Sequence, residues 1–291
     1  MFTDSIDSVF FISDKIRSFC LRIAVAFLAL LTTSTLNAGE LRIVTLAPHL
    51  TEWVYSLQEE DNLVGVSAYS DYPESALSKP IIADYQGVNI AALLHLKPDL
   101  VLAWEGGNKP QDIARIKSLG INVFLSRPQV PEDIVTELLE LGTLLNKSHQ
   151  AQKLVEPFSK TLNTLRLKYA KQQKIPIFYY SWHNPIMTIG KEAWGNQLLK
   201  VCGAETIFSD SPVDYPTVSA QQVLLKQPEI ILSISDKPIE EVRQYWEKHH
   251  AFLNARYIRT NPDIMSRYTL RLAPELTRLC TSINNDEDKT H

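Results

Sequence analysis

A helix, a proline and an apolar strand occur twice in the same order, and this near-repeat constrains the fold of the 291-residue chain more than any other feature. Residues 89–104 read NIAALLHLKPDLVLAW, and residues 219–234, 130 positions later, read SAQQVLLKQPEIILSI. In each copy a polar residue precedes helical spacing, and a proline followed by an acidic residue (Pro98, Pro228) ends the helix before a buried strand. One such match can arise by chance in any α/β chain, but two lobes of equal architecture explain it better.

Strands and helices alternate on both sides of this repeat. The expected strands are 42–46, 62–66, a short strand ending at 83, 100–103, 121–125, 177–180, 230–234 and 256–259. The expected helices are 51–57, 89–96, 110–119, 131–145, 196–201, 240–249 and 269–282. Because such alternation places consecutive strands side by side through right-handed crossovers, the sequence predicts an α/β fold with parallel sheets.

Residues 148–173 predict one long helix between the halves. Apolar residues recur there at spacings of three and four, which marks a single helical stripe, and Pro157 predicts a bend. Roughly 26 residues of helix would extend about 39 Å, enough to run behind two lobes. The predicted organisation is a first lobe at 39–147, the linker helix at 148–173, a second lobe at 174–283 and a tail at 284–291.

The N-terminus predicts a secretory signal peptide at residues 1–38. Positive residues, Arg17 among them, precede a short apolar run at 21–31, and small or polar residues follow it to Ala38. The run is shorter than the roughly 20 residues that span a bilayer, so a cleaved signal is favoured over an uncleaved anchor or a buried helix. We therefore expect a periplasmic protein.

Two cysteines remain after the signal, Cys202 and Cys280. An even pair in an exported chain favours a disulfide, and two free buried thiols are the alternative. A bridge would close a loop of about 78 residues, for which the chain-entropy relation gives about 4 kcal/mol of stabilisation.

Composition and motifs argue against nucleic-acid binding and catalysis. The formal net charge is −4, and no cluster of lysine and arginine stands out. The sequence has no glycine-rich phosphate loop, no Gly-x-Ser-x-Gly turn and no cysteine pair at zinc spacing. An exported hydrolase would need a nucleophile beside a base, and no such pair has supporting context, so we expect a protein that is not an enzyme and uses no catalytic cofactor.

Aromatic residues recur in loops that follow strands. These residues are Tyr69, Tyr72, Tyr85, Trp104, Trp182 and Tyr215. In open parallel sheets, ligands bind beyond the carboxyl ends of the strands. The aromatic residues therefore predict a cleft between the lobes for a large, partly apolar ligand, whereas core packing is the alternative for any single one.

One histidine also follows the first strand of each half. His49 and His183 could face one another and hold a metal ion together with acidic residues. The alternative is a pair of loop histidines that only form hydrogen bonds.

Several of these loops resemble a known family. The matching stretches are VGVSAYSDYP (64–73), ADYQGVN (83–89), LKPDLVLAWEGGN (96–108), GKEAWGNQLLKVCGAETIF (190–208) and DYPTVSAQQVL (214–224). Together they resemble the periplasmic cobalamin-binding proteins of bacterial vitamin ABC importers, a class of solute-binding proteins hinged by a single helix. The similarity covers nearly all of residues 41–283.

The resemblance implies two Rossmann-like lobes joined by one long helix, a monomer, and cobalamin or cobinamide held in the cleft as transported ligand. Tyr69 stands at the family's corrin-contacting tyrosine, residues 263–267 align with a loop of the second lobe that touches the ligand, and Cys202 and Cys280 match the family's disulfide. With the aromatic residues, the predicted ligand contacts are Tyr69, Tyr85, Trp104, Trp182, Tyr215, Asp263, Ile264, Met265, Ser266 and Arg267. Haem, an iron chelate or a metal ion is the alternative ligand, because the wider class includes such binders.

The chain departs from the family pattern at several positions. The family docks on its permease through one glutamate per lobe, and these positions are Ala91 and Gln221 here. Tyr85 and Tyr215 stand where a relative has tryptophan, and His49 replaces a small residue. The neutral docking positions leave open a ligand-free interaction protein, and His49 suggests a neighbour of the cobalt in a corrinoid that lacks its lower base.

Overall fold

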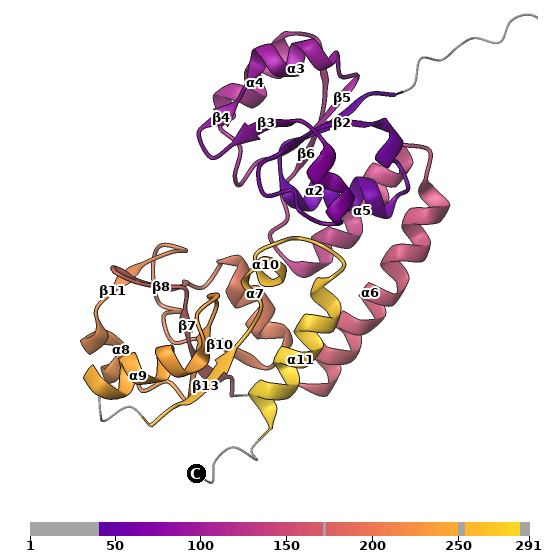
Figure 1. The fold of residues 1–291 in the computed structure, drawn as a ribbon. Helices are drawn as coiled ribbons and strands as arrows, with labels where there is room; N and C mark the ends of the chain where they lie inside the picture. Colours follow the sequence, from indigo (N-terminus) through magenta and orange to yellow (C-terminus); the bar gives the residue numbers. More distant parts are fainter. Residues whose placement is uncertain (1–40, 171–172, 250–253, 286–291) are drawn as a thin grey trace, which may run out of the picture. The chain divides into compact units, whose positions relative to one another are not determined.

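The computed structural model describes residues 41–170, 173–249 and 254–285. The predicted signal peptide, residues 1–38, and most of the predicted tail lie outside the described residues. The described residues from Arg42 onward form one compact unit, which contains both predicted lobes. Two mainly parallel sheets, each with helices against it, make this unit an α/β fold (Figure 1).

The first lobe is built on a six-stranded sheet in the order β4-β3-β2-β1-β5-β6. Its strands are β1 (Ile43–Thr45), β2 (Leu63–Ser67), β3 (Ile81–Asp84), β4 (Gly87–Val88), β5 (Leu100–Trp104) and β6 (Asn122–Ser126). Its helices are α2 (Pro48–Ser56), α3 (Ile90–Leu96), α4 (Pro110–Ser118) and α5 (Pro131–Leu144), with short 3-10 turns η1 (Glu60–Asn62) and η2 (Glu74–Ser78). All neighbouring strands are parallel except β3 and β4. The carboxyl ends of β1, β2, β3, β5 and β6 therefore share one edge.

The second lobe contains a parallel sheet in the order β10-β7-β12-β13 and a small antiparallel sheet in the order β11-β9-β8. The parallel strands are β7 (Ile175–Tyr180), β10 (Ala204–Thr206), β12 (Ile230–Ser233) and β13 (Arg256–Arg259). The antiparallel strands are β8 (Trp182–His183), β9 (Ile186–Met187) and β11 (Thr217–Val218). The helices are α7 (Trp194–Val201), α8 (Ala220–Lys226), α9 (Ile239–His249), α10 (Pro262–Met265) and α11 (Leu272–Asn284).

Each lobe has its own apolar core. In the first lobe, β-branched strand residues such as Val44 and Val101 pack with Leu93 of α3. In the second, Phe178 and Ile231 of the sheet pack with Trp246 of α9. Burial of the sheet faces by helices explains why the strands read as continuous apolar runs.

Helix α6 (Ser148–Lys168) connects the two lobes over 21 residues. Its buried residues are Ala151, Val155, Phe158, Leu162 and Leu165, which is the predicted apolar stripe. The helix packs on α5 of the first lobe and on α7 and α11 of the second, and Figure 1 shows it running beside α11. It ends at Lys168, five residues before the predicted boundary at 173.

The near-repeat is confirmed in three dimensions. The side chains of Asn89 and Ser219 cap α3 and α8 by accepting from the backbone N–H three residues on, at 3.0 and 3.2 Å. Both helices end in a residue with left-handed backbone, Lys97 at φ 47° and Gln227 at φ 45°. Helix α3 then leads into β5, and helix α8 leads into β12, which are the strands that the repeat predicted.

Three local predictions were wrong. Helix α2 begins at Pro48, not at residue 51, because Pro48 occupies the first helical turn after the extended Ala47. The last helix is Leu272–Asn284 instead of 269–282. Trp182 lies in the two-residue strand β8 instead of a loop, since so short a strand leaves no periodic signal.

Candidate functional site

The predicted aromatic residues of the first lobe lie at the carboxyl ends of strands, whereas Trp182 begins β8 and Tyr215 lies in the loop before β11. Tyr69 follows β2, Tyr85 follows β3, and Trp104 is the last residue of β5. Tyr69 and Tyr85 are 75% and 81% exposed, and Trp182 and Tyr215 of the second lobe are 59% and 61% exposed. The side chains of Tyr69 and Tyr85 are exposed to this degree and contribute little to the core, so they can pack against an apolar ligand.

A glycine turn fixes the position of Trp104. A Cβ atom on Gly107 would lie 2.1 Å from the indole, and one on Gly106 would lie 2.8 Å from it, so only glycine lets the ring lie against this backbone. Asn108 closes the turn by accepting from the Trp104 N–H at 2.7 Å and donating to the Leu46 carbonyl at 2.8 Å. The Trp-Glu-Gly-Gly-Asn sequence therefore forms a turn that positions one half-buried indole.

His49 lies beneath this indole, on α2. Its side chain is 3% exposed, and its ring makes edge contacts with Trp53 at 5.3 Å, Trp104 at 5.7 Å and Tyr268 at 5.1 Å between centroids. Burial lowers the pKa of His49 to about 3. His49 is therefore a neutral buried histidine at neutral pH.

Tyr268 joins the aromatic residues of the two lobes. Its ring lies 5.5 Å from Trp104 and 4.5 Å from Trp194, and its carbonyl accepts from Trp53 Nε1 at 2.9 Å. The Tyr215 hydroxyl interacts with the backbone of Trp194. Trp104 and Tyr215, predicted from separate loops, are thus linked through Tyr268 and Trp194. The sequence did not predict Tyr268 or Trp194 as site residues, although Tyr268 directly follows the predicted loop 263–267.

Four charged residues also connect the lobes, and we call them the charged bridge: Glu52, Asp71, Arg267 and Arg271. Arg267 donates to Asp71 at 2.6 Å and lies 3.4 Å from Glu52. Arg271 donates from Nε to Glu52 at 2.8 Å, and its guanidinium lies 4.0 Å from the ring centroid of Tyr72. The hydrogen bond from Arg267 lowers the pKa of Asp71. The Tyr-Ser-Asp-Tyr-Pro stretch therefore presents Tyr69 to solvent and uses Asp71 and Tyr72 to hold the second lobe.

This bridge changes the expectation for residues 263–267. The Arg267 side chain is 11% exposed and is bound by carboxylates, and Met265 is fully buried, with its carbonyl accepting from Trp194 Nε1 at 3.0 Å. Neither side chain presents a free surface for a ligand. Asp263 and Ser266 are exposed and Ile264 is half-buried, so the loop's contribution rests on these.

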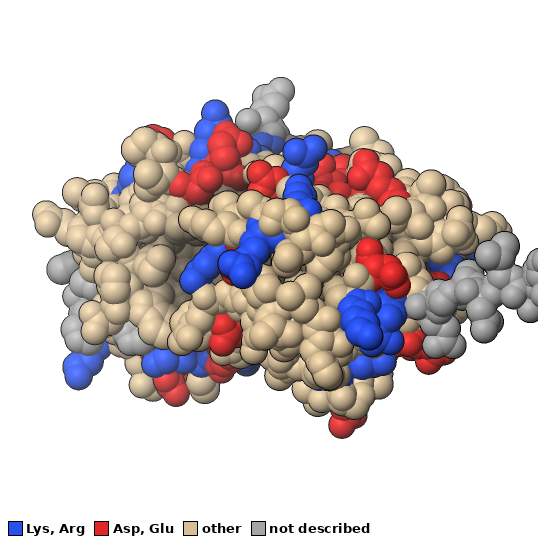
Figure 2. All heavy atoms as spheres, turned by 90° about the horizontal axis from the view of Figure 1, so that it is seen from above, with Lys and Arg blue, Asp and Glu red and all other residues tan. Residues whose placement is uncertain are grey.

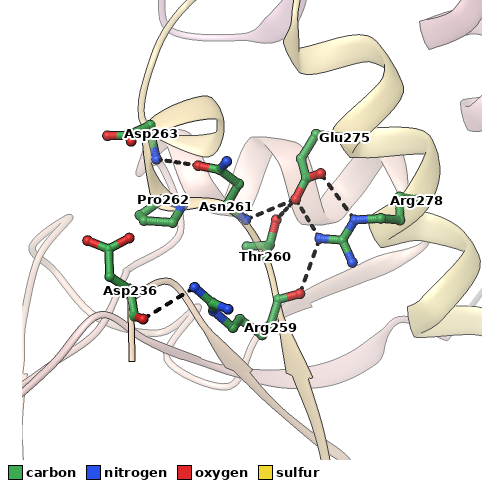
Figure 3. Close-up of a pocket in the computed structure, with 8 residues that line it drawn as sticks. All are labelled: Asp236, Arg259, Thr260, Asn261, Pro262, Asp263, Glu275 and Arg278. Atoms are coloured by element: carbon green, nitrogen blue, oxygen red, sulfur yellow. Dashed lines mark hydrogen bonds and ion pairs between the residues drawn. The ribbon is translucent and has the colours of Figure 1, made fainter. Parts of the chain in front are cut away.

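Asp263 also lines a polar cavity of about 520 Å³ at the end of β13 (Figure 3). Burial favours the neutral form of Glu275 there, but hydrogen bonds from Arg278, Thr260 and Asn261 outweigh it and lower its pKa to about 2. Five charged and no aromatic side chains line the cavity: Asp236, Arg259, Asp263, Glu275 and Arg278. It is therefore unsuited to the aromatic packing that the exposed rings offer.

The cysteine prediction is confirmed. Cys202, at the end of α7, is bonded to Cys280 of α11, with Cα atoms 4.6 Å apart. Both residues are fully buried. The disulfide fastens the helix that follows the charged bridge to the core of the second lobe.

No metal site accompanies these residues. Within the described part of the chain, no group of three or more histidine, cysteine, aspartate and glutamate residues could hold an ion. Ser126 and Glu137 lie beside His49, but Ser126 is fully buried and donates its proton to Glu137 at 2.5 Å. Because it is fully buried, the Ser126 hydroxyl has no exposed surface for a substrate to approach.

The surface gives no sign of an extended basic patch on the face that Figure 2 shows, where acidic and basic side chains are interspersed. None of the helices in the described ranges has the length and apolar character needed to cross a membrane. Ala91 and Gln221 are exposed at equivalent positions, the second residue of α3 and of α8.

Comparison with known proteins identifies relatives over most of the chain. The profile of a protein family described as periplasmic binding protein matches residues 43–244. The vitamin B12-binding protein of Vibrio cholerae serotype O1 is 36% identical over 243 residues, which cover 82% of this chain and 88% of the relative. That of Yersinia pseudotuberculosis serotype O:1b is 36% identical over 260 residues, which cover 89% and 91%.

Comparison with solved structures identifies similar proteins as well. The crystal structure of the periplasmic vitamin B12-binding protein of Vibrio cholerae matches with a TM-score of 0.78 at 35% identity, covering 85% of this chain and 98% of that one. The periplasmic haem-binding protein of the same species matches with a TM-score of 0.73 at 19% identity, covering 85% and 100%. At the lower identity the likeness shows the fold alone.

Proposed function

Because this chain belongs to the periplasmic binding protein family, we propose that it captures cobalamin or cobinamide in the periplasm and delivers it to an ABC import permease. It acts by binding, without catalysis, and the corrinoid is its cargo. The exposed aromatic residues, at strand ends of the first lobe and beside the small antiparallel sheet of the second, are the observation that supports this function most directly.

The corrinoid would bind between the strand ends of the two lobes. Tyr69, Tyr85 and Trp104 would contact it from the first lobe, and Trp182 and Tyr215 from the second. Flat rings suit a macrocycle, because aromatic surfaces bury a large area at a small cost in side-chain entropy. Asp263 and Ser266 could accept hydrogen bonds from the amide side chains of the corrin.

The relatives support the choice of ligand. The named vitamin B12-binding proteins share 36% identity with the chain over most of its length, whereas the haem-binding structure shares only the fold. The histidine that favoured haem or a metal ion, His49, is buried and neutral. We therefore keep haem, iron chelates and metal ions as alternative outcomes of the test.

Calorimetric titration of the purified mature protein, without the predicted signal peptide at residues 1–38, tests this function. We expect one site for cyanocobalamin, with submicromolar affinity, and binding of cobinamide. Trp104→Ala and Tyr69→Ala should each weaken binding about tenfold or more, because each removes one ring from the contact. Leu167→Ala, which changes an 82% exposed apolar residue on α6, is the control and should bind normally. Binding of haem or zinc, with no heat from either corrinoid, would disprove the assignment.

Docking on the permease is expected to differ from the salt bridges of the family. Ala91 and Gln221 offer no charge, so contacts of α3 and α8 would be hydrogen-bonded or apolar. Transport into vesicles that contain the permease should then depend little on ionic strength, since salt screens charged pairs. A steep loss of transport at high salt would contradict neutral docking.

A further inference from the structure

We propose that His49 is a positioning residue for ligand capture, which holds the Trp104 indole in place from below and couples it to Tyr268 of the second lobe. Its own side chain is 3% exposed and acts only through these rings. This role rests on the proposed function, because a bound corrinoid is what Trp104 would contact.

A chain of hydrogen bonds fixes the His49 ring. Ser126 has one hydroxyl proton and donates it to Glu137 at 2.5 Å, and the other Glu137 oxygen accepts from the Arg127 N–H at 2.9 Å. Ser126 Oγ lies 3.2 Å from His49 Nε2, and it can only accept there because its proton is already used. The neutral ring therefore has its proton on Nε2, and its plane cannot rotate without breaking this bond.

The fixed ring contacts three aromatic neighbours at nearly right angles. The interplanar angles are 80° to Trp53, 89° to Trp104 and 81° to Tyr268. Edge-to-face contacts of this kind are favourable and directional. Rotating or removing the imidazole would therefore disturb all three neighbours together.

Two kinds of contact restrain Trp104. The backbone of Gly106 and Gly107 lies against the indole, and the rings of His49 and Tyr268 contact it at steep angles. Glycine excludes some orientations, but it makes no side-chain contact that selects one. Without His49 the indole would sample other orientations. Ligand binding would then have to order the indole, and the entropy lost would weaken the affinity.

The side chain at position 49 must both fill the space and donate. Leucine would fill part of the space but leave Ser126 without its donor, and alanine would remove both contributions. Glutamine has an amide N–H that can reach a neighbouring acceptor. These three substitutions separate the hydrogen bond from the volume.

Calorimetric titration with cyanocobalamin tests the proposal, at a temperature where circular dichroism shows each variant folded. His49→Ala should weaken binding at least tenfold, and His49→Gln should bind within about threefold of the wild type. In a Trp104→Ala background, His49→Ala should cause no further loss, because the residue acts through that indole. Unchanged affinity of His49→Ala, or an equal loss in both backgrounds, would overturn the positioning role.

A spectroscopic measurement separates this role from the proposed function. The near-ultraviolet circular dichroism of Trp104, obtained by difference from Trp104→Phe, should diminish in His49→Ala and return in His49→Gln. If the wild type binds no corrinoid, the proposed function fails, and this signal still decides whether His49 orders the indole. Ser126→Ala keeps the His49 ring but removes its acceptor, together with the hydrogen bond from Ser126 to Glu137; it provides a second variant if His49→Ala does not fold, and it should also diminish the signal. An unchanged signal in both would contradict the proposal.

Discussion

Arg271 and Glu52, 219 residues apart in the sequence, join the two lobes through an Nε to Oε2 hydrogen bond of 2.8 Å. Glu52 is 5% exposed and also lies 3.4 Å from Arg267, so one buried carboxylate serves two guanidinium groups. Removing one partner of such a group leaves the other charges uncompensated, which costs more than the pair contributes.

Glu52→Gln should therefore lower the free energy of unfolding by about 2–3 kcal/mol. This is below the roughly 3–5 kcal/mol of a fully buried pair, because Arg271 is 26% exposed and water compensates part of its charge. Urea denaturation measures the change. Glu132→Gln, whose partner Arg166 lies 2.8 Å away across exposed surface, is the matched control and should cost less than about 1 kcal/mol. Equal effects in the two variants would show that the bridge contributes no more than a surface pair.

Gly107→Ala should weaken cobalamin binding by displacing the Trp104 indole. The new Cβ would lie 2.1 Å from the ring, so the ring must move. We expect a loss of about tenfold in affinity, with a smaller change in thermal stability because the indole is only half-buried. A double-mutant cycle with Trp104→Ala is the control, since the alanine at 107 then has no indole to displace. Additive losses in affinity would mean that Gly107 acts independently of Trp104.

Loss of the disulfide should destabilise the protein without abolishing binding. The bridge closes a loop with a sequence separation of 78, and the chain-entropy relation gives about 4 kcal/mol for such a loop. The double variant Cys202→Ala, Cys280→Ala should show this difference in urea denaturation, and its folded form should bind cobalamin normally. Dithiothreitol should destabilise the wild type similarly and leave the double variant unchanged. A double variant as stable as the oxidised wild type would contradict the expected contribution.

The sequence predicted those elements whose signals are local. The caps Asn89 and Ser219 and the apolar stripe of α6 follow from spacing within a few residues, and each is present. The cysteine pairing was accessible by counting, because only two cysteines follow the predicted signal peptide. Tyr69 and Tyr85 were accessible because they follow strands that could be recognised.

The contacts between the lobes could not be predicted in the same way. Glu52 lies 219 residues from Arg271, and Trp53 lies 215 residues from Tyr268, and nothing in the residues around any one of them indicates its partner. His49 was assigned to a loop because the start of α2 was placed three residues late, and that shift concealed its burial. Distant pairing and the first turn of a helix depend on tertiary packing, which short patterns do not encode.

The protonation of His49 predicts a specific dependence of stability on pH. Burial lowers the pKa of His49 from 6.5 to about 3. Below about pH 6.5 the histidine therefore binds a proton in the unfolded chain but not in the folded chain. Its contribution to stability is therefore fully present above about pH 6.5 and declines as the pH falls toward 3, by roughly 1.4 kcal/mol per pH unit at most.

Burial raises the pKa of Glu137, which acts in the opposite direction, so the comparison must be made between variants that both retain Glu137. We expect His49→Gln to lose less stability than the wild type between pH 7 and about pH 4.5, as measured by urea denaturation at each pH. Cobalamin affinity of the wild type should be constant between about pH 6 and 8, because His49 stays neutral throughout. Parallel pH profiles of stability in the two proteins would show that His49 titrates normally and is not buried as described.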